Sequence, residues 1–344
     1  MEGERLDLRK CSPEELKDLT DNFSEANLIG ETQFGRVFRG KTQQGQDVTV
    51  KIWEEGGLLY VGKNENRSQL MAECTFLKEP SVNHHPNLAK LMGYCCEDGL
   101  LGVVYDLNPL DTLRNLIVKD SFSWLQRIKV AIGFARVLEL LHGQSPEYIV
   151  RNIDAAHIML DQGYNPIVFD FGMLTGGVLG DKSSAPNRLL LGSFGYIDLR
   201  IPASGVFMPR TDVFSFGTLL LELISKRVRA KNNEIRLPVH MLLEKNELPC
   251  PVHMWAENAY TQQKRKKSIF SFGPSKISLV RESLEKDFGF NQRDGCKITK
   301  LAMGCVQKEI HCRGKKVRPR PTMKEVVQIL GDLYAVHHHK DVGF

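Results

Sequence analysis

The sequence predicts an α+β protein with two lobes, a small β-rich lobe followed by a larger, mainly helical lobe. Between residues 22 and 105, runs rich in β-branched and aromatic residues, such as DVTVKIW and LGVVYD, alternate with Gly- and Gln-rich turns, a pattern typical of strands. One helical stretch, 67–78, interrupts them. From Thr112 onward, apolar residues recur at intervals of three and four residues. This spacing predicts helices over 124–142, 214–224 and 323–333.

The same pattern divides the chain into segments. Charged residues and Pro-containing turns make 231–276 the weakest tract for globular structure, and we expect a long surface excursion there. In chain order, we expect an N-terminal extension at 1–21, the β-rich lobe at 22–104, a hinge at 105–108, the helical lobe at 109–336 and a tail at 337–344.

The composition is that of an ordinary globular protein. Of the 344 residues, 42% are hydrophobic and 25% are charged, which excludes mainly disordered, collagen-like and membrane-embedded chains. The net charge of +5 is too small to indicate nucleic-acid binding. The eight cysteines lack the paired spacing of a zinc site, and no apolar stretch approaches the ~20 residues that span a bilayer. We therefore expect a soluble intracellular protein with reduced thiols, no transmembrane segment and no nucleic-acid partner.

A strand lysine, a helix glutamate and an Asp-Phe-Gly triplet follow one another in the chain, at Lys51, Glu73 and 170–172. With these residues, the sequence resembles the plant receptor-like cytoplasmic kinases over nearly its whole length. The shared blocks occur in the family's order: FSEANLIGETQFGRVFRG, VTVKIW, HHPNLAKLMGYC, LGVVYD, VFDFG, GSFGYI, TDVFSFGTLLLELISKR and RPTMKEVVQIL. The resemblance implies the bilobal protein kinase-like fold.

The resemblance also implies a nucleotide site. Lys51 stands where the family's lysine contacts the α- and β-phosphates, Glu73 where a glutamate positions that lysine, and Asp170 where an aspartate binds Mg²⁺. Further nucleotide contacts are implied at Gly30, Gly35, Val37, Thr49, Asp106 and Met159. The glycine-rich segment keeps only its first and last glycines, and Thr49 replaces a small alanine beside the adenine. We therefore expect ATP and Mg²⁺ to bind weakly.

The catalytic loop departs from the family pattern at three positions. Asn152 replaces the aspartate that accepts the proton of the substrate hydroxyl, and a neutral amide cannot act as a carboxylate base. Asp154 replaces the lysine that neutralises the γ-phosphate. His157 replaces the asparagine that coordinates a second Mg²⁺, and an imidazole nitrogen suits that ion poorly. Each change opposes phosphoryl transfer.

The substrate end is altered too. The chain reads Asp198-Leu199-Arg200 where the family has Ala-Pro-Glu. In the family that glutamate pairs with an arginine that aligns with Arg320, so we expect a like-charge contact between Arg200 and Arg320 unless the segment follows another path.

Architectural positions are kept. Asp212 matches the aspartate that anchors the catalytic-loop backbone in the family. Leu77, Val150 and Phe171 can form the apolar stack that links the lobes. We therefore expect the kinase-like fold to be kept even though catalytic residues are replaced.

Regulation by phosphorylation is a further hypothesis. Thr175, Ser183, Ser184 and Ser193 follow the Asp-Phe-Gly triplet, where partner kinases often phosphorylate this family. Arg151 is retained and could pair with such a phosphate.

Several features have a second interpretation. Lys51 and Glu73 could form a mere surface ion pair, and Asp154 could serve as a displaced base. His157 and the run 337–339 could be metal ligands, although a solvated tail is the simpler interpretation of that run. A basic quartet could contact anionic lipid, but such a run usually belongs to a solvated loop. It consists of Lys264, Arg265, Lys266 and Lys267.

Loss of polar catalytic residues with retention of packing residues predicts a pseudokinase. We expect an intracellular signalling adaptor with little or no phosphoryl transfer, resembling the pseudokinase members of this plant family that act in immunity. The resemblance implies immune receptors, active kinases or pathogen effectors as partners, and a cytoplasmic location that partners could bring to the inner face of the plasma membrane. The alternatives are a Ser/Thr kinase of low activity and a conformational switch that binds ATP without transferring phosphate.

Overall fold

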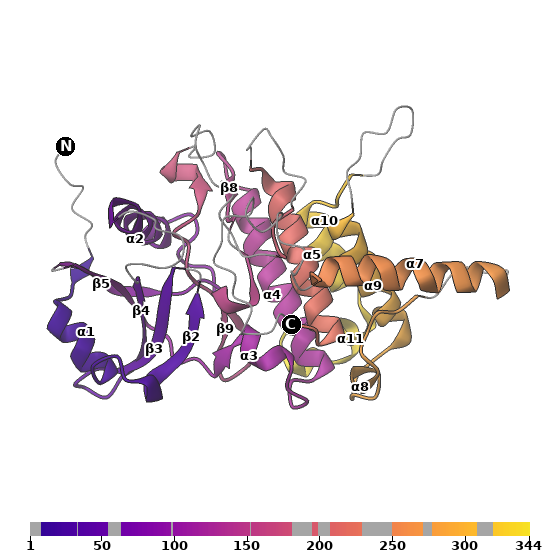
Figure 1. The fold of residues 1–344 in the computed structure, drawn as a ribbon, viewed down its shortest axis with the longest axis horizontal. Coiled ribbons are helices and arrows are strands. Elements are labelled where there is room, and N and C mark those ends of the chain that lie inside the picture. The colour runs from indigo at the N-terminus through magenta and orange to yellow at the C-terminus, as the bar shows by residue number, and fades with distance from the viewer. Residues whose placement is uncertain are drawn as a thin grey trace.

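The protein has two lobes in the computed structural model, as the sequence predicts (Figure 1). A small lobe built around a β-sheet lies beside a larger helical lobe that carries the C-terminus. The structure describes residues 8–32, 34–53, 63–97, 99–151, 153–180, 195–198, 207–228, 250–270, 277–307 and 319–344, without the side chains of 63–64 and 266–270.

The small lobe contains a six-stranded sheet in the order β1-β5-β6-β4-β3-β2. Its pairs are antiparallel except for β1 and β5, which run parallel. The strands are β1 (Arg9–Lys10), β2 (Leu28–Thr32), β3 (Gly35–Lys41), β4 (Asp47–Trp53), β5 (Leu91–Glu97) and β6 (Leu100–Tyr105). Helix α2 (Lys63–Lys78) packs against β5 and β6. The helix expected at 67–78 therefore begins one turn earlier.

The expected N-terminal extension contributes to this lobe. Helix α1 (Pro13–Thr20) begins at Ser12, whose hydroxyl accepts a hydrogen bond from the Glu15 amide at 3.1 Å. It packs against β3, β4 and β5 and fully buries Leu16. Because β1 also pairs with β5, residues 9–20 are part of the sheet lobe rather than an appendage.

The large lobe is built around α4 (Trp124–His142) and α5 (Pro209–Ser225). Helix α4 coincides with the range expected from periodicity, and it contacts α5 and α10, while α5 contacts α9. The other helices are α3 (Leu113–Ile117), α7 (Val252–Phe270), α8 (Glu282–Glu285), α9 (Gln292–Val306), α10 (Met323–Gly331) and α11 (Tyr334–His338). The short strand β7 (Asp111–Thr112) precedes α3. Four more short strands lie between α4 and α5 in the chain, β8 (Tyr148–Ile149), β9 (Ile158–Leu160), β10 (Pro166–Val168) and β11 (Thr175–Gly176), as do the 3₁₀ turns η2 (Ala155–His157) and η3 (Gly177–Leu179). Two more 3₁₀ turns are η1 (Glu25–Asn27) and η5 (Lys340–Val342).

The expected surface excursion at 231–276 contains a packed helix. Helix α7 contacts α5 and α9, and its far end projects from the lobe (Figure 1). Val252, Trp255, Ala256 and Ala259 recur at helical spacing and pack against the core, a pattern that the many charged residues nearby obscure in the sequence. Residues 229–249 and 271–276 lie outside the described part of the chain.

The C-terminal tail is folded against the large lobe. The His338 ring stacks on Tyr334 with 3.6 Å between centroids, and His339 meets Phe288 edge-on at 5.1 Å. The η5 turn contacts α4. Within the described residues, no group of three or more His, Cys, Asp or Glu side chains has a metal-holding arrangement, and His337 and His338 are exposed.

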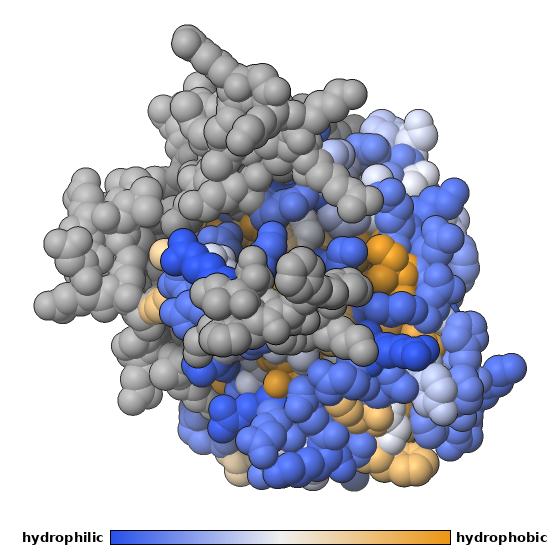
Figure 2. Space-filling view, turned by 90° about the vertical axis from the view of Figure 1, so that its right-hand side faces the viewer, coloured by the Kyte–Doolittle hydropathy of each residue, from blue (hydrophilic) through white to orange (hydrophobic). Residues whose placement is uncertain are grey.

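The outer end of the large lobe is mainly hydrophilic where described residues are in view, with hydrophobic residues in small separate patches (Figure 2). Lys264 and Arg265 of the basic quartet are exposed on α7. Among the helices that the structure describes, none combines the length and apolar content needed to cross a bilayer.

A buried pair ties residues 195–198 to α5. The Tyr196 hydroxyl donates to the Glu222 carboxyl group, and the Ser215 hydroxyl donates to the Tyr196 carbonyl at 2.7 Å. Burial raises the pKa of Glu222 to about 8, although the Tyr196 hydrogen bond acts to lower it. Glu222 is therefore a proton-binding group in the folded protein at neutral pH.

This shift predicts a pH-dependent stability. Between pH 4.5, the ordinary pKa of glutamate, and about 8, the unfolded chain releases a proton that the folded protein keeps, so the free energy of unfolding falls as pH rises. Urea denaturation should show the difference between wild type and Glu222→Gln falling by roughly 1.4 kcal/mol per pH unit in this window. Glu14→Gln, at an exposed position, is the control. Parallel pH curves for wild type and Glu222→Gln would refute the assignment.

Candidate functional site

Lys51 and Glu73 form a buried ion pair. Lys51 lies in β4, where it pairs with Val37 of β3 and Val103 of β6, and its Nζ is 3.2 Å from Oε2 of Glu73 on α2. Both side chains are fully buried. The other Glu73 oxygen accepts hydrogen bonds from the Tyr105 hydroxyl at 2.5 Å and the Asp170 amide at 2.8 Å. A surface ion pair is therefore excluded, and the glutamate is fixed by three donors.

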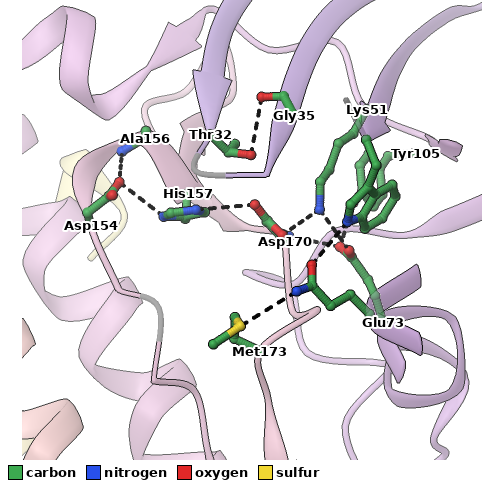
Figure 3. A network of polar contacts seen from close by, with 12 residues as sticks. Thr32, Gly35, Lys51, Glu73, Tyr105, Asp154, Ala156, His157, Asp170 and Met173 are labelled. Carbon is green, nitrogen blue, oxygen red and sulfur yellow. Dashed lines mark hydrogen bonds and ion pairs between the residues drawn. The ribbon is translucent and has the colours of Figure 1, made fainter. Parts of the chain in front are cut away.

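Asp170 lies between two cationic side chains (Figure 3). Its Oδ1 contacts the Lys51 ammonium, and its Oδ2 is 3.2 Å from Nε2 of His157. Burial acts to raise the pKa of Asp170, but Lys51 and His157 together hold it below its usual range. The carboxylate is therefore ionised, with both oxygens engaged.

Asp154 and His157 form the other end of this chain of charges. Asp154 caps the η2 turn by accepting a hydrogen bond from the Ala156 amide at 2.6 Å. The turn also brings the His157 ring next to the Asp154 carboxylate, with Nδ1 3.0 Å from Oδ1 of Asp154. Burial acts to lower the pKa of His157, but the two carboxylates outweigh it and raise the pKa to about 10. The imidazole is consequently a cation at neutral pH.

These groups do not fit a magnesium ion. Mg²⁺ requires oxygen ligands in a near-octahedral arrangement, and the Asp170 oxygens are already held by an ammonium and an imidazolium. His157 presents a protonated nitrogen where the family has an amide oxygen. A divalent cation bound at Asp170 would displace either Lys51 or His157 and would be repelled by the one that remained.

The slot expected for the adenine is closed. Val37, Thr49 and Met159 each expose at most 1% of their surface. The Thr49 hydroxyl donates to the Leu107 carbonyl in the hinge at 2.8 Å. This bond joins the sheet directly to the hinge. The alanine that the family has at this position has no hydroxyl and could not form it.

The roof strand β2 also rests on the large lobe. It contacts β7 and η2, and the Asn115 side chain donates to the Ile29 carbonyl at 3.2 Å. A Cβ added at Gly30 would come within 3.2 Å of the Thr112 methyl group. A cavity of about 240 Å³ remains along this edge, lined by residues that include Leu28, Gly30, Thr112, Asn115 and Ala156.

Two other expected nucleotide contacts have different surroundings. A Cβ at Gly35 would lie 1.8 Å from the Ile52 carbonyl, so glycine is required by the close approach of β3 and β4. The exposed Asp106 side chain accepts a hydrogen bond from Gln46 at 2.9 Å. Sheet packing therefore accounts for Gly35, and the Asp106 carboxylate is not brought to the buried charges.

The catalytic loop is anchored by Asp212 of α5. Its carboxylate accepts the amides of Val150 at 2.8 Å and Arg151 at 3.0 Å, and contacts His142 at 3.1 Å. Arg151 has a positive φ of 67°. Asn152 lies outside the described residues.

The apolar positions expected to link the lobes are buried in one core. Leu77, Val150 and Phe171 each expose at most 5%. The Phe171 ring packs on Phe76, with 4.6 Å between centroids.

Among the expected phosphorylation sites, Thr175 is inaccessible. It is 1% exposed and donates its hydroxyl to the Gly180 carbonyl at 3.3 Å. The Arg151 guanidinium lies 4.0 Å from the centroid of the Phe207 ring. Ser183, Ser184 and Ser193 lie outside the described residues.

Arg320 pairs with a carboxylate. Its guanidinium binds Asp198 and donates to the Arg210 carbonyl at 3.0 Å and the Gln307 carbonyl at 3.3 Å. Asp198 lies two residues before Arg200, which is itself outside the described residues. An acid two residues before the expected position therefore supplies a counter-charge to Arg320.

Sequence reasoning missed Tyr105 and Trp53. The Tyr105 hydroxyl binds Glu73, and the Lys51 ammonium lies 3.7 Å from the centroid of the Trp53 ring. A signal was present for each, since Trp53 is two positions from Lys51 on the same face of β4, and Tyr105 ends the strand paired with β4.

Comparison with known proteins gives the family. A model described as "Protein tyrosine and serine/threonine kinase" matches residues 23–263, and the chain belongs to this family. "Probable serine/threonine-protein kinase PBL11" of Arabidopsis thaliana is 30% identical over 97% of this chain and 80% of the relative. "Receptor-like cytoplasmic kinase 176" of Oryza sativa subsp. japonica is 30% identical over 93% and 74%. "Serine/threonine-protein kinase PBS1" of Arabidopsis thaliana is 36% identical over 62% of this chain and 46% of the relative.

Solved structures give the fold. The pseudokinase domain of BIR2, "an immune regulator of the RLK/Pelle family", superposes with a TM-score of 0.63 at 21% identity, covering 96% of this chain and 87% of that one. The pseudokinase GRMZM2G135359 gives a TM-score of 0.57 at 19% identity over 96% and 95%. The predicted bilobal kinase-like fold and the resemblance to plant receptor-like cytoplasmic kinases are thus confirmed.

The Arg320 pair predicts a coupled loss of stability. Arg320→Ala leaves the buried Asp198 without a counter-charge and should lower the free energy of unfolding by about 3–5 kcal/mol in urea denaturation. Asp198→Asn in the same chain removes the stranded charge, so the double variant should be more stable than Arg320→Ala by at least about 1 kcal/mol. Additive losses would show that the two side chains do not interact.

Proposed function

We propose that this kinase-family chain is a pseudokinase that works as a protein-binding signalling adaptor with little or no phosphoryl transfer. The observation that carries the proposal is the contact between His157 and Asp170. The His157 side chain lies where a metal ion would bind the Asp170 carboxylate in this family. Without an accessible Asp170, the phosphates lack their main electrostatic partner.

The catalytic-loop substitutions support the same conclusion. Asn152 offers no carboxylate base, and base catalysis typically contributes ~10²–10⁴-fold. Asp154 is a poor substitute because it is 5% exposed and its carboxylate holds the Ala156 amide and His157. The interpretation of Asp154 as a displaced base is therefore weaker than its role in the buried charges.

An adaptor role fits the retained frame. The two-lobed shape, whose surface a partner would contact, is maintained by Asp212, the Arg320–Asp198 pair and the buried apolar core. The rice relative is named a receptor-like cytoplasmic kinase and the BIR2 domain an immune regulator, and we extend a cytoplasmic setting and a place in plant immune signalling to this chain. Immune receptors, active kinases and pathogen effectors are the proposed partner classes.

A Ser/Thr kinase of low activity is the second candidate. The Lys51–Glu73 ion pair is formed and reaches Asp170, which is the arrangement that positions ATP phosphates in this family. The curated relatives are named serine/threonine kinases.

Transfer of radiolabelled phosphate from Mg·ATP separates these functions. We compare wild type with the triple variant Asn152→Asp, Asp154→Lys, His157→Asn, which restores the family residues. The proposal predicts that wild type transfers no more than about one-hundredth as fast as the triple variant. Lys51→Met in each background is the control for a contaminating kinase. Transfer by wild type near the rate of the triple variant, abolished by Lys51→Met, would establish the second candidate instead.

A further inference from the structure

The metal-binding position of the family contains a positive charge that belongs to the chain itself. Three carboxylates, Glu73, Asp170 and Asp154, alternate with Lys51 and His157 in one buried row (Figure 3). Every member exposes at most 5% of its surface. Buried carboxylates of this kind require counter-charges, and here both come from side chains.

We propose that the His157 ring, placed between Asp154 and Asp170, occupies the position of the family's Mg²⁺ and joins the two lobes without metal or nucleotide. This inference deepens the proposed pseudokinase function and rests on it. It concerns how the closed form is held, which the transfer of phosphate does not report.

The charge on His157 follows from its geometry. Nδ1 faces a carboxylate oxygen of Asp154 at 3.0 Å and Nε2 faces one of Asp170 at 3.2 Å. A neutral imidazole has one nitrogen without hydrogen, and its lone pair would then oppose a carboxylate oxygen. At these ion-pair distances, only the doubly protonated ring directs positive charge at both carboxylates.

The row of charges crosses from one lobe to the other. Lys51 and Glu73 belong to β4 and α2 of the small lobe, whereas Asp154 and His157 belong to the loop that ends in η2. Asp170 touches both groups, through Lys51 on one oxygen and His157 on the other. In the family that connection is completed by a metal ion and phosphates, which are ligands that come and go.

A permanent cation would make closure constitutive. The roof contact through Asn115 and the hinge bond of Thr49 lie beside this row and restrict the same cleft. The surface that a partner meets would then be independent of ATP and Mg²⁺ concentrations, which suits an adaptor rather than a switch.

Thermal unfolding with and without metal tests the inference. Purified wild type, His157→Asn and the exposed control His84→Asn are melted in EDTA and in millimolar Mg²⁺, each with and without ATP. In EDTA, His157→Asn should melt about 5–10 °C lower than wild type, because it leaves two buried carboxylates without their shared cation. Millimolar Mg²⁺ should recover about 3 °C of that loss, since asparagine offers an oxygen ligand beside Asp170. Wild type and His84→Asn should not respond to Mg²⁺.

Direct metal binding covers the case in which His157→Asn does not fold. Electron paramagnetic resonance of Mn²⁺ with wild type needs no variant and should show no binding below millimolar concentrations, and His157→Gln provides a second amide variant. Mn²⁺ binding by wild type, a Mg²⁺-dependent rise in its melting temperature, or a folded His157→Asn that melts like wild type would each overturn the inference. Any of these can occur without phosphate transfer, so the inference can fail while the proposed function stands.

Discussion

The interface between the lobes depends on how the buried carboxylate of Asp170 is neutralised. In this chain it is neutralised by two side chains, Lys51 from the sheet and His157 from the loop that matches the family's catalytic loop. Asp154 completes the arrangement, because a single substitution to histidine would have buried a ring with one favourable partner instead of two. The changes at 154 and 157, which look like separate losses in the sequence, are therefore parts of one interaction.

The surrounding structure narrows the cleft between the lobes. Strand β2 contacts β7 and η2, and the Thr49 hydroxyl donates a hydrogen bond to the hinge carbonyl that borders the adenine slot. The supporting frame is retained nearby, with Asp212 holding the loop backbone and Arg320 provided with a new carboxylate in Asp198. The interactions that maintain the shape of the fold are retained. The residues at positions that face the substrate or metal in the family contact other buried side chains instead.

The sequence predicted the two lobes and the main helices from periodicity, and the resemblance to the kinase family implied that Lys51, Glu73 and Asp170 share one site. The sequence predicted His157 as a lost Mg²⁺ ligand or as a ligand of another metal and not as a partner of Asp170, since the approach of Asp170 depends on tertiary packing that no local pattern encodes. The three-residue spacing of Asp154 and His157 was a usable signal, because one 3₁₀ turn aligns such positions. Alignment by motif position set Arg200 against Arg320, whereas a shift of two residues gives Asp198. Helix α7 was obscured by its charged residues.

The central claim is that His157 is an imidazolium held between two carboxylates, and nuclear magnetic resonance of ¹⁵N-histidine measures this most directly. The ring nitrogens of His157, assigned by comparison with His157→Asn, should both carry protons at neutral pH and keep them well above the ordinary pKa of 6.5. The rings of exposed histidines such as His84 provide the internal reference. A His157 spectrum with one protonated and one bare nitrogen at neutral pH would contradict the account.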